Sequence, residues 1–233
     1  MLSYIYMFDP MYFLFLAPGM LLAMWAQYRV KSAYAEGAQI QASSGMTGAQ
    51  AAQRILDIFG ITNVRIESIN SFLGDHYDAR KKVLRLSPDV FNGRSIAALG
   101  IAAHEVGHAI QDAKNYSPLV IRNGLVPLAS TGSSLSFILI MMGLFIQGFQ
   151  WLAIAGVALF GTVVLFQLVN LPVEFNASSR ARAILVDHGL ISPMEDRAVA
   201  KVLNAAAMTY VAATLTALMQ FLYFALRVLG DRR

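Results

Sequence analysis

The sequence contains no cysteine among its 233 residues. This absence excludes disulfide bonds and zinc sites built from thiolates, so histidine and carboxylate side chains are the only strong zinc ligands available. Charge is also scarce, because only 14% of the residues are Asp, Glu, Lys or Arg and none lies between Arg122 and Glu174. Histidine occurs only four times. The few histidine and charged residues are therefore the first candidates for functional residues.

What the chain has in abundance is apolar sequence, with 57% hydrophobic residues. A stretch of about 20 apolar residues is enough to span a bilayer as a helix, and the uncharged run from Arg122 to Glu174 has room for two. Its hairpin is expected at Gln147–Gln150. The first span lacks the basic region and the cleavage site of a secretory signal and is expected to be a retained anchor. The four predicted transmembrane helices are 1–28, 119–146, 150–173 and 202–229.

The basic residues predict the orientation in the membrane. Eleven of the 18 Lys and Arg lie from Arg29 to Arg122, four lie from Arg180 to Lys201, and three follow the last span. The positive-inside rule therefore places the segments 29–118 and 174–201 in the cytoplasm and both termini outside. We expect a multi-pass protein of the cell (inner) membrane. Its net charge of +4 is explained by contact with the anionic lipid bilayer and needs no nucleic-acid partner.

The cytoplasmic segment 29–118 carries signals for a small folded unit. Arg29–Gly45 is expected to be a linker or an extension of the first helix. Thr47 and Gln50 form a capping box that opens a short amphipathic helix. Two strands are predicted at Val64–Ile69 and Val83–Leu86, joined by the polar stretch Gly74–Lys82 as a hairpin or meander. Ser95 is placed to cap a helix that runs from Ile96 to Ile110.

That last helix contains the motif His104-Glu105-Val106-Gly107-His108. A spacing of four places both imidazoles on one helix face, where they can bind a single Zn²⁺. Glu105 can then act as the general base toward a water molecule. The alternative is a pair of core histidines that bond to carbonyl groups or to Glu105 without a metal. Gly107 costs the helix about 1 kcal/mol relative to alanine, so it is either simply tolerated or required by a closely packed neighbour.

A catalytic zinc usually has three protein ligands, and the third defines the class of enzyme. In the metzincin pattern a glycine and a histidine follow at positions that Gln111 and Lys114 occupy here, so that class is excluded. A glutamate ligand, as in the gluzincins, remains. Glu174 is the best candidate, because it ends the uncharged run and Pro172 allows the membrane helix to bend or restart just before it.

Other interpretations of these positions stay open. Glu174 can be an ordinary interfacial glutamate that pairs with Arg180 or is solvated. His76, Asp187 and His188 are the fallback metal ligands.

The chain resembles the bacterial YugP-type family of neutral zinc metallopeptidases. The similarity is carried by Gly74–Asp78, Arg85–Ser87, Ala103–Ala109, Leu171–Ser178 and Ala207–Ala213. The chain is more distantly similar to the HtpX-like and CAAX-processing membrane proteases. The resemblance implies that His104, His108 and Glu174 bind zinc and that Glu105 is the base. One position departs from the distant relatives, because Ser178 stands where they have an aspartate that orients a ligand histidine.

These observations predict a mainly α, integral membrane protein with a zincin-like metallopeptidase subdomain, made of a small β-hairpin and the motif helix. Its function would be that of a membrane-embedded zinc metalloendopeptidase acting on membrane or membrane-proximal proteins. Tyr210 or His188 can donate to the oxyanion, and the edge of Val83–Leu86 can bind a substrate strand. The rival interpretation is a non-catalytic membrane protein with a structural or relic metal site that binds a partner. A metal transporter is disfavoured, because the spans lack ionisable residues.

Overall fold

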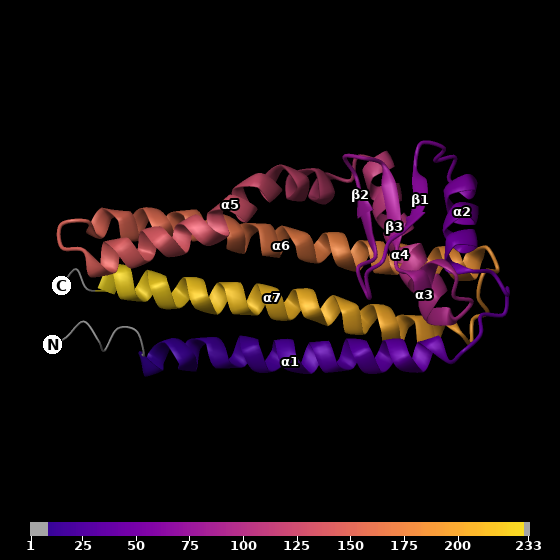
Figure 1. Cartoon of the computed structure of the whole chain (residues 1–233), viewed down its shortest axis with the longest axis horizontal. Helices are drawn as coiled ribbons and strands as arrows, with labels where there is room; N and C mark the ends of the chain where they lie inside the picture. The colour runs from indigo at the N-terminus through magenta and orange to yellow at the C-terminus, as the bar shows by residue number, and fades with distance from the viewer. Residues whose placement is uncertain (1–8, 231–233) are drawn as a thin grey trace. The chain divides into compact units, whose positions relative to one another are not determined.

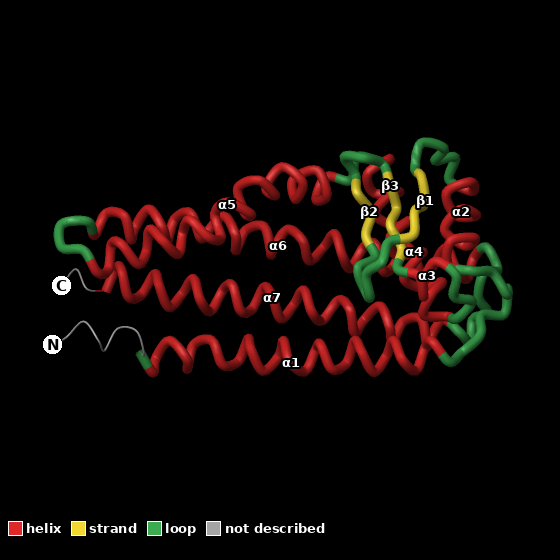
Figure 2. Tube along the Cα trace, viewed as in Figure 1, coloured by secondary structure: helices red, strands yellow, loops and turns green. Residues whose placement is uncertain are grey.

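The computed structural model describes residues 9–230, which form a mainly helical protein with one small sheet (Figures 1 and 2). The helices are α1 Pro10–Ala38, α2 Gly48–Ile58, α3 Pro88–Phe91, α4 Ile96–Ala113, α5 Ser117–Phe145, α6 Gln150–Asp187 and α7 Asp196–Gly230, and the strands are β1 Arg65–Ser68, β2 His76–Asp78 and β3 Val83–Leu86. The described chain divides into two compact units. Unit 1 comprises 9–25, 121–171 and 209–230, and unit 2 comprises 26–120 and 172–208. Helices α1, α5, α6 and α7 each contribute to both.

Four helices, α1, α5, α6 and α7, are long and apolar enough to cross a membrane. The prediction of a mainly helical protein with four spans is therefore confirmed at the level of length and composition. Their segments in unit 1 expose large apolar side chains, including Leu14 at 65%, Trp151 at 62% and Leu226 at 62%. Such side chains are favourable against lipid and unfavourable against water.

Within unit 1, α5 and α6 form a tight antiparallel pair. They are joined by the short connection 146–149, where the hairpin was predicted. A side chain at Gly143 would lie 2.2 Å from the backbone nitrogen of Ala153, and one at Gly156 would lie 2.7 Å from the carbonyl oxygen of Ser136. Small residues therefore let the two backbones touch, as is common between membrane helices.

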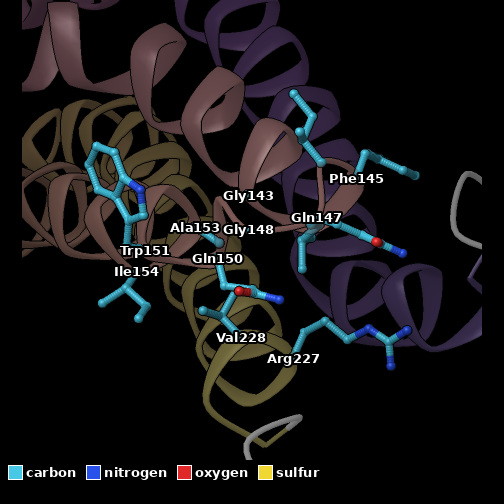
Figure 3. A pocket seen from close by; sticks show the side chains of 12 residues that line it. Gly143, Phe145, Gln147, Gly148, Gln150, Trp151, Ala153, Ile154, Arg227 and Val228 are labelled. Carbon is cyan, nitrogen blue, oxygen red and sulfur yellow. The ribbon is translucent and has the colours of Figure 1, made fainter.

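A cavity of about 600 Å³ lies in unit 1 beside the connection between α5 and α6 (Figure 3). Gln147, Gln150 and Trp151 line it together with Arg227 of α7. No residue of the histidine motif belongs to this cavity. The candidate site is instead assembled within unit 2.

Three long helices extend well beyond their predicted spans, and α7 does so by starting at Asp196 instead of residue 202. Helix α1 continues to Ala38, so the first part of Arg29–Gly45 is a helix extension. Helix α6 continues through Pro172 to Asp187 without a break, so the predicted possibility of a restart there is wrong. Proline removes one backbone hydrogen bond but is tolerated when the surrounding packing holds the helix. That packing is provided on the far side of Pro172 by Ala177 and Ala181, both completely buried.

The sheet of unit 2 has the strand order β1-β3-β2. β1 pairs with β3 in parallel, with Arg65 opposite Val83, and β2 pairs with β3 antiparallel, with His76 opposite Arg85. The two predicted strands exist, but β2 was missed inside the polar stretch, and the hairpin is formed by β2 and β3. Strand β3 is central and paired on both sides. The prediction that its edge accepts a substrate strand is therefore wrong, and the open edges of the described sheet belong to β1 and β2.

Local sequence signals fix the ends of the helices around the motif. The capping box is formed as predicted, with the Thr47 backbone N–H donating to Gln50 Oε1 at 2.9 Å and the Gln50 N–H donating to Thr47 Oγ1 at 3.2 Å. Ser95 Oγ accepts from the Ala98 N–H at 3.2 Å and caps α4. The core of unit 2 then sets the rotation of α4, because Ile55 of α2 and Leu84 of β3 pack with it and are fully buried.

Candidate metal site

Helix α4 presents His104 and His108 on one face, as the spacing of four requires. Their ring centroids lie 4.8 Å apart, with the ring planes at 87°. The opposite side of the helix is anchored in the core through Val106 and Ile110, both completely buried. The two imidazoles are consequently held in a fixed direction by the packing of the whole helix.

Helix α6 brings Glu174 to the same point. Its Oε2 atom lies 3.3 Å from His104 Nε2 and 3.5 Å from His108 Nε2. Among the described residues, these three side chains are close enough together to bind one metal ion. Zinc with bonds of about 2.0–2.1 Å in tetrahedral geometry places neighbouring ligand atoms about 3.3–3.4 Å apart. The observed separations therefore fit zinc.

The environment of Glu174 supports the same conclusion. The residue is only 2% exposed, and Oε2 is buried with no hydrogen-bond partner in the described chain. A buried carboxylate oxygen without a donor is costly, and a cation is the partner that removes this cost. Among the described residues, Glu174 has close contacts with the two histidines and no ion pair with Arg180, whose Nε donates to Asn176 Oδ1 at 2.7 Å.

The electrostatics of His108 reflect these neighbours. Burial lowers the pKa of His108, but the Glu174 and Glu105 carboxylates raise it, and the net shift is upward. An imidazole with a raised pKa is a more basic ligand, so the same carboxylates that attract a proton also strengthen its attraction for a metal cation. Glu105 itself is 8% exposed.

The other titratable candidates lie elsewhere. Both ring nitrogens of His76 are engaged, since Nδ1 lies 2.8 Å from the Gly74 carbonyl oxygen and Nε2 lies 3.3 Å from Arg85 Nη1. His188 and Asp187 are not members of the three-residue group. Tyr210 belongs to the part of α7 that lies in unit 1, and its role as an oxyanion donor stays a prediction.

The second ring nitrogen of each motif histidine has a partner of its own. Ser178 Oγ lies 3.1 Å from His104 Nδ1, so the serine takes the place expected from the resemblance. Gln111 Oε1 lies 3.0 Å from His108 Nδ1. Gln111 was overlooked as a functional residue in the sequence, although its position three residues after His108 places it on the same helix face.

Gly107 marks the closest approach of α4 and α6. A Cβ atom at this position would lie 2.9 Å from the Ala177 carbonyl oxygen and 3.3 Å from the Ala177 Cα. Of the two interpretations left open by the sequence, close packing is therefore the one that the structure supports. The glycine allows the helix with the two histidines to approach the helix with Glu174.

We expect Gly107→Ala to destabilise the protein and to weaken metal binding. Overpacking against backbone costs about 1–3 kcal/mol, whereas alanine recovers about 1 kcal/mol of helix propensity. The net loss of about 1 kcal/mol should lower the thermal unfolding midpoint by about 2–4 °C. Gly124→Ala is the matched control, because nothing lies within 4 Å of a Cβ there and the midpoint should stay or rise. Equal midpoints for both variants would contradict the packing role of Gly107.

One turn beyond His108, the side chain of Asp112 fastens the sheet to α4. Tyr77 of β2 donates its hydroxyl to Asp112 Oδ2 at 2.6 Å, and Lys82 pairs with the same carboxylate. Burial and then this hydrogen bond raise the pKa of Tyr77 well above its ordinary value, so the hydroxyl remains a donor. The bond from Tyr77 thereby fixes edge strand β2 to the motif helix α4, and both elements are labelled in Figure 1.

Two histidines from one helix and a glutamate from another form a donor set of the kind used by zinc-dependent peptidases. The chain belongs to the family described as "Putative neutral zinc metallopeptidase", whose model matches residues 12–229. It is 45% identical over 223 residues to the "Putative membrane protease YugP" of Bacillus subtilis (strain 168). The matched region covers 95% of this chain and 99% of that protein. The resemblance found in the sequence is thus confirmed. No solved structure matches the chain.

Proposed function

We propose that this protein is a zinc-dependent metalloendopeptidase of the gluzincin type, with the sheet and α4 as its zincin-like subdomain. The observation that carries the proposal is the convergence of His104, His108 and Glu174 on one buried carboxylate oxygen that has no other partner. Family membership supports the same activity.

Each residue of the site has a distinct task in this proposal. His104, His108 and Glu174 hold the zinc ion. When bound, zinc supplies a Lewis acid that acidifies water and polarises the carbonyl of the scissile peptide bond. Glu105 accepts the proton of the attacking water and passes it to the amine that leaves. Tyr210 or His188 is proposed to donate a hydrogen bond to the oxyanion.

The number of ligands favours catalysis over a structural metal. Structural zinc sites are closed by four protein ligands, whereas catalytic sites use three and keep one position open for water. The group in the described chain has three members, and Glu105 is not one of them. A non-catalytic protein that binds a partner through a structural or relic site would have no use for this open position or for a glutamate inside the motif.

The substrates are proposed to be membrane or membrane-proximal proteins. Four apolar helices support residence in the cell (inner) membrane, and the basic residues favour a cytoplasmic site. An extended peptide can pair with the open edge of a sheet. We place this role on β2, because Tyr77 ties that edge strand to the motif helix.

Metal removal tests the proposal. In membranes that contain the protein, cleavage should create new N-termini in membrane-proximal proteins, which N-terminal proteomics detects. A zinc chelator should prevent these cleavages. Zinc should restore the same cleavages after the chelator is washed out, whereas magnesium, which prefers six oxygen ligands, should not. An identical set of N-termini with and without the chelator would overturn the proposal.

A further inference from the structure

The side chain of Gln111 is the most completely buried amide in unit 2, with 0% of the residue exposed. It lies on α4, three residues after His108 and therefore on the same face. Its amide makes three hydrogen bonds. Oε1 faces His108 Nδ1 at 3.0 Å, and Nε2 donates to the Val173 carbonyl oxygen at 2.9 Å and to Asn176 Oδ1 at 3.0 Å.

These contacts determine which way the amide points. A backbone carbonyl can only accept, so the Gln111 atom that faces Val173 must be the nitrogen. Asn176 Oδ1 also accepts from Arg180 Nε at 2.7 Å, and this second donor keeps the asparagine oxygen turned toward Gln111. The remaining atom, Oε1, is therefore the one that faces His108.

The orientation of Gln111 in turn determines the tautomer of His108. An amide oxygen can only accept, so His108 Nδ1 must carry the hydrogen. In the neutral imidazole, which is the form that binds a metal, the other nitrogen, Nε2, then has a free lone pair, and it is this nitrogen that lies 3.5 Å from Glu174 Oε2. His104 differs, because its partner Ser178 has a hydroxyl that can donate or accept and imposes no tautomer.

We propose that Gln111 is a positioning residue of the metal site, which holds His108 as the tautomer that offers Nε2 to zinc. Its two other bonds reach Val173 and Asn176, on either side of Glu174, so the same amide also joins α4 to the helix that carries the third ligand. The inference rests on the proposed zinc site and adds to it a residue that neither touches the metal nor belongs to the motif. Partners of this kind change metal affinity by about 10–100-fold.

Three variants separate this role from a merely structural one. Gln111→Met keeps the length of the side chain but replaces the amide with a thioether, whose sulfur is only a weak acceptor for His108. Gln111→Glu keeps an acceptor oxygen but loses both hydrogens that reach α6. Asn176→Ala removes one of the bonds to α6 and leaves the contact between Gln111 and His108 intact.

The experiment measures zinc affinity of the metal-depleted full-length protein by competition with a chromogenic chelator, together with the visible absorption of bound Co²⁺. Gln111→Met should bind zinc about 10–100-fold more weakly and change the Co²⁺ spectrum. Gln111→Glu and Asn176→Ala should bind zinc about as tightly as the wild type, because an acceptor oxygen still faces His108 Nδ1. The unfolding midpoint without metal shows whether each variant is folded, and Asn176→Ala keeps the comparison decisive if Gln111→Glu does not fold.

The outcomes are distinguishable. Wild-type affinity in Gln111→Met would overturn the positioning role alone. An equal loss in Gln111→Met and Asn176→Ala would also overturn it, because the bridge between the helices would then account for the effect. A wild-type protein that binds no zinc would overturn the proposed function itself.

Discussion

Glu105→Gln is expected to reduce peptide-bond cleavage by roughly 10²–10⁴-fold, the usual contribution of a general base, while zinc stays bound. Glutamine has the same shape as glutamate but cannot accept a proton from water near neutral pH. The three residues of the metal group are untouched by the change, so the metal content should remain that of the wild type. Cleavage is measured on membranes containing either protein, and zinc by elemental analysis of the purified chains.

Glu67→Gln is a matched control for this prediction. Glu67 lies on β1 with its side chain 41% exposed, and the same loss of charge there should leave cleavage unchanged. Turnover retained in Glu105→Gln would remove Glu105 from its role as the base. Loss of both cleavage and zinc would instead assign it to metal binding.

Glu174→Ala is expected to abolish zinc binding at concentrations that saturate the wild type. The variant has only two histidines to bind zinc. Its zinc affinity should therefore fall by more than the factor of about 10–100 that is lost when a hydrogen-bond partner of a ligand is removed. The effect on folding should depend on the metal. A ligand present at 100 times its dissociation constant stabilises the folded state by about 2.7 kcal/mol, and only the wild type should show this gain on adding zinc.

Without metal, the same substitution should cost little, because it also removes a buried oxygen that has no hydrogen-bond partner. Glu36→Ala is the control, since that carboxylate lies at the surface of α1, paired with Lys201, and its loss should leave zinc binding unchanged. Unchanged zinc stoichiometry in Glu174→Ala would redirect the search for the third ligand to His188 or His76.

The parts of the fold that the sequence predicted are those fixed by local signals. The capping box at Thr47 and the cap at Ser95 involve residues three apart, and the apolar spans follow from composition alone. Strand β2 was missed because His76–Asp78 is short and polar, so its extended conformation depends on pairing with β3 and on the bond from Tyr77 to Asp112. Asp112 lies 35 residues from Tyr77, and the pairing with β3 leaves no apolar alternation within the three residues of β2 that would mark it as a strand.

The candidate site divides in the same way. His104 and His108 are recognisable from their spacing, and Glu174 is indicated by its place at the end of an apolar run, where a carboxylate needs a partner. The contact of Gln111 with the Val173 carbonyl, 62 residues away, was not predictable, because it depends on how closely two helices approach. The glycine at position 107 is a local sequence signal for such a close approach, but the residue that approaches it, Ala177, is known only from the structure.

Helix α6 continues through Pro172 without a break, so the directions of Glu174, Ala177 and Ser178 all depend on the same helical register. Glu174 and Ser178 are four residues apart, as are His104 and His108, so each pair lies on a single face of its helix. Deleting one residue between Glu174 and Ala177 would turn everything beyond by about 100°. The oxygen that faces the imidazoles, the hydroxyl beside His104 and the contact surface for Gly107 would then point in different directions. Homologous chains should therefore vary in residue type here far more readily than in length.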